Sequence, residues 1–222
     1  MNMSSNKNQK LYSVITGDIV KSSKLTIELH KKLVKVIRRC SKEVQKVFPA
    51  ALKYEPELFR GDSFQLLIQK PEEALSIALF YRAYLKANMT DNKIDARMAI
   101  SVGTVDYIES SFGVGDAYKI SGKALDKRGK RRIKFASDII SDSDFIDLII
   151  LNADFISTRW TSNQSKIILL ALQNYEQNKI ASKLKISQQA VSKHLESTGW
   201  NIVSENINYF KDVLLKNKKR KS

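Results

Sequence analysis

The sequence of 222 residues is poor in the side chains that bind transition metals or form disulfides. Its single cysteine, Cys40, cannot form a disulfide within the chain, and no cysteine cluster exists that could hold zinc. The two histidines, His30 and His194, lie far apart in the sequence, which argues against a histidine-rich metal site.

Long apolar segments are also missing. No apolar run approaches the ~18–20 residues that a membrane span needs, and the most apolar stretch, residues 145–156, is interrupted by Asp147 and Asp154. The first ten residues are polar and lack the apolar segment of a secretory signal. We therefore expect a soluble cytoplasmic protein without a membrane partner.

Acidic residues are scarce relative to basic ones, with 23 Asp and Glu against 38 Lys and Arg, for a net charge of +15. Such an excess favours a polyanionic partner, either a nucleic acid or the phosphates of a nucleotide. Much of the excess is concentrated in residues 119–135 and 216–222. Both segments could contact phosphates, although a run of charge is more commonly a solvated surface segment.

The first 158 residues alternate between short apolar runs and amphipathic segments. Strands are expected near residues 11–18, 51–59, 63–68, 94–105 and 132–136, and helices near 22–47, 71–87, 116–126 and 141–156. This order predicts an α+β, ferredoxin-like fold, in which an antiparallel sheet has helices on one face. We expect a disordered arm over residues 1–10 and this domain over residues 11–158.

Beyond residue 160 the pattern is helical throughout. Helices are expected near residues 163–175, 177–184, 187–197 and 203–216. We therefore expect an all-α domain over residues 159–215, followed by a disordered basic tail over residues 216–222.

Residues 178–195 resemble a helix-turn-helix. Ala181 is small where two helices must approach each other, and Ser187 stands where the second helix needs a cap. Lys185 occupies the turn position that is often glycine, which predicts some backbone strain there. The apolar contacts between the helices are expected from Leu184, Ile186, Val191 and Leu195.

At ~100° per residue, the second of these helices has one polar face that points outward. Its side chains could contact bases or phosphates, and they are Gln188, Gln189, Ser192, Lys193 and Glu196. This face predicts DNA binding. The alternative is a small helical module that serves contacts with a second copy or another partner.

Two aspartates are expected at one end of the sheet. Asp18 ends the first strand, and Asp62 lies in the hairpin between the second and third strands. Two carboxylates that meet there could hold Mg²⁺ or Mn²⁺, which in turn would bind a triphosphate. The structural alternatives are that Asp18 caps the following helix and that Asp62 is an ordinary turn residue.

These two segments, with residues 97–105 and 113–126, resemble the palm-type domain of class III nucleotide cyclases. The resemblance implies that Asp18, Asp62 and the backbone carbonyl of Ile19 bind metal. Where active cyclases carry an Asn and an Arg, this chain has Lys119 and Lys123. These lysines can neutralise phosphate, which makes them the candidates for nucleotide binding and catalysis. The lysine that selects adenine in active cyclases is replaced here by Leu58.

A palm-type domain followed by a helix-turn-helix resembles the SatD-type family of bacterial proteins over nearly the whole chain. We therefore expect a DNA-binding regulatory protein whose cyclase-like domain binds a metal and a nucleotide or pairs two chains into a homodimer. The first alternative is a metal-dependent nucleotidyl cyclase or nucleotidyltransferase that acts on nucleoside triphosphates. The second is an adaptor that binds only protein.

Overall fold

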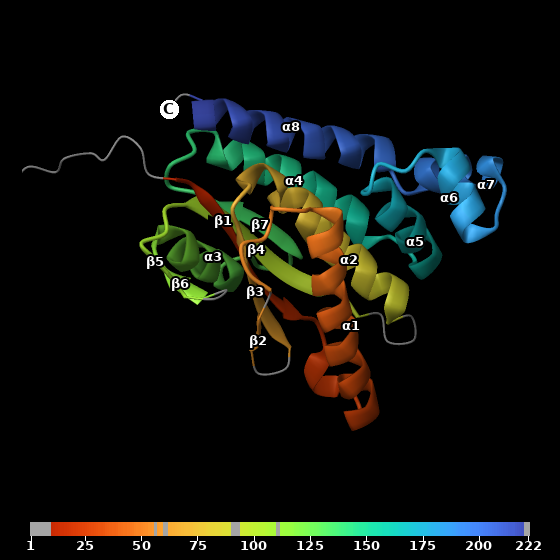
Figure 1. Cartoon of the computed structure of the whole chain (residues 1–222), viewed down its shortest axis with the longest axis horizontal. Helices are drawn as coiled ribbons and strands as arrows, with labels where there is room; N and C mark the ends of the chain where they lie inside the picture. Colours follow the sequence, from red (N-terminus) through yellow and green to blue (C-terminus); the bar gives the residue numbers. More distant parts are fainter. Residues whose placement is uncertain (1–9, 56, 60–61, 90–93, 110–111, 220–222) are drawn as a thin grey trace, which may run out of the picture.

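The computed structural model describes residues 10–55, 57–59, 62–89, 94–109 and 112–219, and its architecture is α+β (Figure 1). In this part of the chain a five-stranded sheet has the order β2-β3-β1-β4-β7. Its strands are β1 (Tyr12–Ile19), β2 (Glu57–Phe59), β3 (Ser63–Ile68), β4 (Ala96–Gly103) and β7 (Ile133–Ala136). Residues 1–9 of the arm expected over residues 1–10, residues 60–61 of the hairpin and residues 220–222 of the expected tail lie outside the described residues.

The sheet is mixed, so the prediction of a wholly antiparallel sheet is wrong at one edge. The pairs β2–β3, β3–β1 and β1–β4 are antiparallel, whereas β4 and β7 are parallel. The chain leaves β4, forms the hairpin of β5 (Tyr107–Glu109) and β6 (Phe112–Val114), and then crosses over through α3 (Asp116–Asp126). A helical crossover of this kind returns the chain in the same direction, which makes the last strand parallel.

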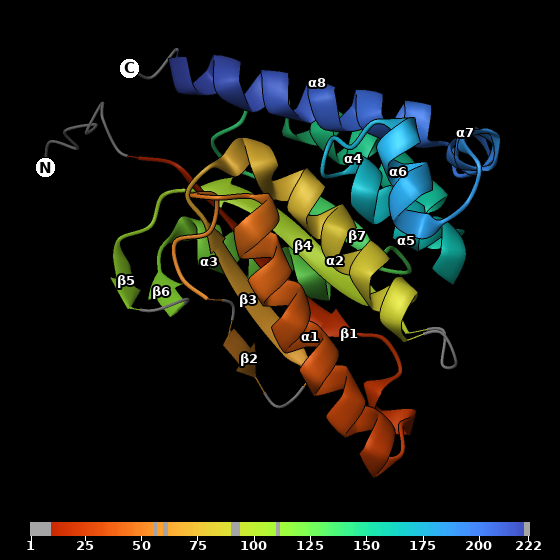
Figure 2. The same ribbon diagram turned by 45° about the vertical axis from the view of Figure 1, so that its right-hand side comes forward.

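Helices cover both faces of the sheet, so the expectation of helices on one face is also wrong (Figure 2). Along β1, Ile15 belongs to the core beneath α1 (Ile27–Val47) and α2 (Ala74–Asn88), whereas Val14 packs with Ala117 of α3. Successive strand residues point to opposite faces, which is why α3 lies on the side away from α1 and α2. The hydroxyls of Thr16 and Ser121 lie 2.8 Å apart and join α3 to β1.

Most helix boundaries follow from local capping. The helix expected to begin at residue 22 begins at Ile27, because Thr26 accepts a hydrogen bond from the Leu29 N–H at its amino end. Before it, Ser22–Lys24 form the 3-10 turn η1, and a second such turn, η2 (Pro71–Glu73), precedes α2. The helix expected over residues 141–156 is α4 (Ser143–Thr158).

The C-terminal helices continue the core of the sheet. They are α5 (Ser162–Ala171), α6 (Gln177–Leu184), α7 (Gln188–Ser197) and α8 (Trp200–Lys219). Helix α5 packs on α2, and α8 runs back along α4 (Figures 1 and 2). Phe210 of α8 meets Phe135 of β7 edge to face, with ring centroids 5.9 Å apart. The main core therefore extends past residue 160, and α8 includes residues 216–219 of the expected tail.

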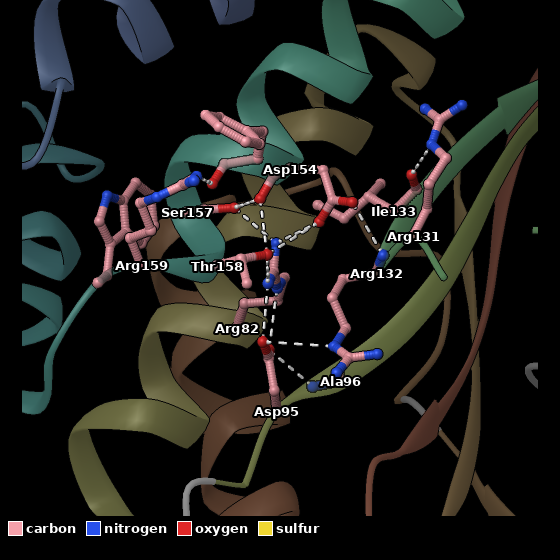
Figure 3. Close-up of polar contacts among 12 residues, drawn as sticks. Arg82, Asp95, Ala96, Arg131, Arg132, Ile133, Asp154, Ser157, Thr158 and Arg159 are labelled. Carbon is pink, nitrogen blue, oxygen red and sulfur yellow. Dashed lines mark hydrogen bonds and ion pairs between the residues drawn. The ribbon is translucent and has the colours of Figure 1, made fainter. Parts of the chain in front are cut away.

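A buried arginine joins α2, β4 and α4 (Figure 3). Arg82 of α2 is fully buried, and its Nε and Nη2 donate to the two carboxylate oxygens of Asp95 at 2.9 and 2.7 Å. Its Nη1 donates to Asp154 of α4 at 2.8 Å. The second oxygen of Asp154 accepts the backbone N–H of Arg132 at 2.9 Å, which adds the start of β7 to the network. One guanidinium thus fixes four segments that lie far apart in the sequence.

The buried arginine and its carboxylate partners favour each other's ionised forms. Burial alone would lower the pKa of Arg82, but Asp95 and Asp154 outweigh it and raise that pKa. Burial alone would raise the pKa of Asp95, but Arg82 outweighs it, and the net pKa lies below the ordinary value of the carboxyl. Arg82 and Asp95 therefore stay ionised at neutral pH.

Substitution Arg82→Met should destabilise the fold strongly, because two buried carboxylates would lose their cation. Removing one partner from a buried ion pair costs about 3–5 kcal/mol of unfolding free energy, which urea unfolding measures. Arg38→Met on the exposed surface of α1 is the matched control and should cost no more than ~0.5 kcal/mol. A loss below ~1 kcal/mol at Arg82 would contradict the structural role of the network.

Stability should also depend on pH through Asp95. Since its pKa is lower in the folded than in the unfolded chain, its charge stabilises the fold above the ordinary carboxyl pKa of about 4. That stabilisation is lost as the pH falls from this value through the folded pKa. Calorimetry should show that the Tm of the unsubstituted protein falls from about pH 7 to pH 3. The variant Asp95→Asn should have a lower Tm at neutral pH, and its Tm should depend less on pH. If Tm depended on pH equally in the unsubstituted protein and in Asp95→Asn, the ionisation of Asp95 would not be the source of the effect.

Candidate functional site

Helices α6 and α7 form a tight pair at the edge of the molecule, away from the sheet (Figure 1). Ser187 caps α7 as predicted, since its hydroxyl accepts the Ala190 N–H at 3.1 Å. Val191 is fully buried on the inner side of α7. It belongs to a small apolar cluster with Ile167, Ala171, Ile180 and Ala181. This cluster fixes which side of α7 faces inward.

The turn between α6 and α7 is left-handed at Lys185, with φ 55° and ψ 44°. The sequence predicted strain at this position because the residue is not glycine. Ile186, in contrast, is 38% exposed and makes no part of the apolar cluster, so the contact predicted for it is wrong. Its N–H donates to the carbonyl of Ala181 at 3.1 Å, and that bond closes the turn while the side chain stays at the surface.

The outer face of α7 carries the side chains that the sequence proposed for DNA contact. All five of them are exposed, namely Gln188, Gln189, Ser192, Lys193 and Glu196. Because Val191 is buried on the opposite side, the face is defined by packing as well as by helical periodicity. Its part in DNA binding stays a prediction.

The carboxyl end of α7 is bonded to the main core. Trp160, which is 4% exposed in the link between α4 and α5, donates its indole N–H to the carbonyl of Thr198 at 3.0 Å. Thr198 is the residue that caps the end of α7. The amide of Gln164 reaches the hydroxyl of Ser197 at 3.2 Å. The α4–α5 link therefore positions α7, a contact that sequence reasoning missed because its partners are 38 residues apart.

At the end of the sheet, the backbones of the two candidate metal ligands meet as expected. Asp18 lies opposite Ser63 in the β1–β3 pair, and the N–H of Ile19 donates to the carbonyl of Asp62 at 2.9 Å. Their carboxylates, however, have separate partners. Arg97 binds both oxygens of Asp18, whereas Asp62 accepts the hydroxyl of Ser22 at 2.7 Å.

As arranged, these two carboxylates do not fit one shared divalent ion. The register of β1 and β4 places Arg97 directly opposite Asp18, so its guanidinium, not the Asp62 carboxylate, lies against both oxygens of Asp18. Among the residues that the structure describes, no group of three or more His, Cys, Asp or Glu side chains could hold a metal. The metal site at Asp18, Ile19 and Asp62 stays a prediction.

The two lysines proposed for nucleotide binding lie on the solvent side of α3. Ser121 and Ala124 face the sheet and are buried, whereas Lys119 and Lys123 are exposed. The Nζ of Lys119 is 3.9 Å from Asp116 on the same helix. A spacing of two residues from Ser121 turns each lysine through ~200°, away from β1. The structure therefore does not bring Lys119 or Lys123 to Asp18.

The basic segment after α3 is divided between structural and unpaired groups. Arg131 binds both carboxylate oxygens of Asp147 in α4, at 2.7 and 2.9 Å. Burial lowers the pKa of Arg128, and the neighbouring charges of Arg97 and Arg132 lower it further. Cations are thus crowded at the end of the sheet where β4 and β7 begin.

With this geometry described, the comparison with known proteins is informative. The sequence model of the SatD family matches residues 12–214 of the chain. The chain belongs to the SatD family. This match to the SatD family spans the sheet, the α6–α7 pair and most of α8. No curated protein matches the chain, and no helix in the described ranges has the length and apolar character needed to cross a membrane.

The turn of this SatD family member offers a direct test of the α6–α7 geometry. Lys185→Gly should raise the free energy of unfolding by up to about 1 kcal/mol, since glycine adopts the left-handed conformation without the penalty of a Cβ. The control is Lys183→Gly, two residues earlier in α6, which should lose about 1 kcal/mol because its backbone is helical. Chemical unfolding gives both values, and an equal loss in both variants would contradict the left-handed turn.

Proposed function

We propose that this SatD family member is a DNA-binding regulatory protein that reads DNA with the outer face of α7. One observation carries the proposal: α7 is capped by Ser187, seated by Val191 and exposed along a continuous polar face. A short helix presented in this way, behind a tight turn from a preceding helix, has the form that enters a major groove.

The side chains of this face suit the two parts of DNA recognition. Gln188 and Gln189 lie at the start of α7 and can each pair with the edge of an adenine. Lys193 can neutralise a phosphate, and Ser192 can bond either a base or the backbone. The net charge of +15 supports association with a polyanion.

The sheet and its helices provide the scaffold in this proposal. The order β2-β3-β1-β4, with α1 and α2 on one face, supports a cyclase-like palm domain of the split βαβ type. Two copies would present two α7 helices, and a palindromic DNA site is the natural expectation. Helix α4 favours pairing, because it exposes Phe145, Leu148 and Phe155 and contains no basic residue.

DNA binding is tested by a mobility shift with duplexes of randomised sequence, followed by selection of the bound fraction. Lys193→Ala should weaken binding to all sequences and reduce the salt slope by about one. Gln189→Ala should cost about 1–3 kcal/mol at one base pair and relax the preference there. Lys42→Ala on the exposed surface of α1 is the control and should retain both affinity and preference.

Two results would reject this assignment. One is the absence of any complex at about 50 mM salt, where phosphate contacts are strong. The other is a complex whose affinity and base preference are the same in both α7 variants as in the unsubstituted protein.

A further inference from the structure

The crowded end of the sheet contains a cavity of about 350 Å³. Three cationic side chains contribute to its wall: Lys21 follows β1, Lys86 lies in the last turn of α2, and Arg132 precedes β7. Asp95 is the one acidic side chain among the described residues that line it. The link between α4 and α5 also lines the cavity through Trp160 and Thr161, as does Ser162 at the start of α5.

The one carboxylate in this wall is already neutralised. Both oxygens of Asp95 accept hydrogen bonds from Arg82, as described above. Lys86 lies 3.6 Å from the same carboxylate, and Arg132 lies 4.0 Å from it. Lys86 and Arg132 thus share an acid that Arg82 already binds, and Lys21 adds a third cation to the wall, so the cavity carries a net positive charge.

Arg132 has an unused donor in this position. Its Nε is buried and has no hydrogen-bond partner among the described residues. The backbone N–H of Arg132, not its guanidinium, makes the structural bond to Asp154. That Nε faces the Oδ2 of Asp95 at 4.0 Å, but the side chain is 31% exposed, so the rest of the guanidinium is suited to receive an acceptor from outside the protein. The nearby Arg97 and Arg128 add to the positive potential.

We propose that this cavity binds a small anion that carries phosphate groups. A guanidinium can bind two phosphate oxygens at once, and lysine contributes a point charge. The hydroxyl of Thr161, which accepts the Gln164 N–H, can donate a further hydrogen bond to such an anion. The volume falls in the range of about 300–1,000 Å³ that is typical of small-molecule sites. It therefore suits pyrophosphate or the phosphates of an organic molecule better than a single inorganic phosphate.

The wall of this cavity is also connected to α7. The Nζ of Lys86 donates to the carbonyls of Thr158 and Trp160, at 2.9 and 3.4 Å. The indole of Trp160 donates in turn to Thr198 at the end of α7. An anion that draws Lys86 toward itself competes with these carbonyls and displaces the link that positions α7. Occupancy of the cavity should therefore change DNA affinity, a consequence that rests on the proposed function.

Binding can be measured without DNA. The chain has two tryptophans, so Trp200→Phe leaves Trp160, which lines the cavity, as the sole residue excited at wavelengths that tyrosine does not absorb. Inorganic phosphate, pyrophosphate and ATP are titrated separately at constant ionic strength, with sodium chloride as the reference. A saturable change in Trp160 emission with pyrophosphate or ATP is expected. Equal affinities would indicate recognition of the phosphates alone, and tighter binding of ATP would indicate a nucleotide.

Two variants in the Trp200→Phe background locate the site. Arg132→Gln and Lys21→Gln should each weaken anion binding at least tenfold. Their matched controls on the surface of α1, Arg38→Gln and Lys42→Gln, remove the same charge and should leave the affinity unchanged. Neither cavity side chain is fully buried, and circular dichroism verifies that both variants fold. The site is refuted if none of the three anions gives a saturable signal, or if both cavity variants bind like the controls.

The connection to α7 is tested separately. A saturating anion should change the Kd for the selected DNA at least fivefold, a typical size for coupled sites. An unchanged Kd would overturn the coupling and leave the anion site standing. Anion binding in a protein that forms no DNA complex would instead overturn the proposed function, so the two failures are distinguishable.

Discussion

The contact of Arg82 with Asp95 and Asp154 is the constraint on which the arrangement of the helices depends. A buried guanidinium requires both carboxylates, because each of the three charges would be costly without the others. The network fixes α4 against α2 and the start of β4. The link that follows α4 is thereby placed, and with it Trp160, which is bonded to the end of α7. A polar network in the core thus determines where the candidate DNA-reading helix stands.

Local patterns predicted much of the fold, and long-range partners were the main omission. Helix α3 was predicted with its observed bounds, and α6 likewise, because periodicity and capping are encoded within a few residues. The partner of Arg82 on α4 lies 72 residues away, and no local pattern indicates it. A signal was nevertheless present: Arg82 and Asp154 are charges flanked by apolar residues in helical segments, and such charges need a partner when buried. The direction of β7 depended on the crossover through α3, which strand patterns do not specify.

The candidate site divides in the same way. The outer face of α7 was predictable because the burial of Val191 and the cap at Ser187 are local properties. The proximity of Asp18 and Asp62 was predictable only for the backbone, since topology brings strands together without choosing side-chain partners. Strand register decides that choice, and it places Arg97 opposite Asp18. This charge-matched pair in register explains why both oxygens of Asp18 accept hydrogen bonds from Arg97.

The same reasoning explains where the excess positive charge is useful. Arg97 and Arg131 each have a carboxylate partner, whereas Lys21 and Arg132 crowd a cavity whose acid is already bound by Arg82. Like charges held together reduce the stability of a fold, and a ligand that binds only the folded chain restores it in proportion to its affinity. A cluster of this kind is therefore a disadvantage to the protein alone and an advantage with an anion bound. Trp160 of the α4–α5 link lines this cavity and is bonded to the end of α7. The binding free energy of an anion is therefore available to bias the position of that helix.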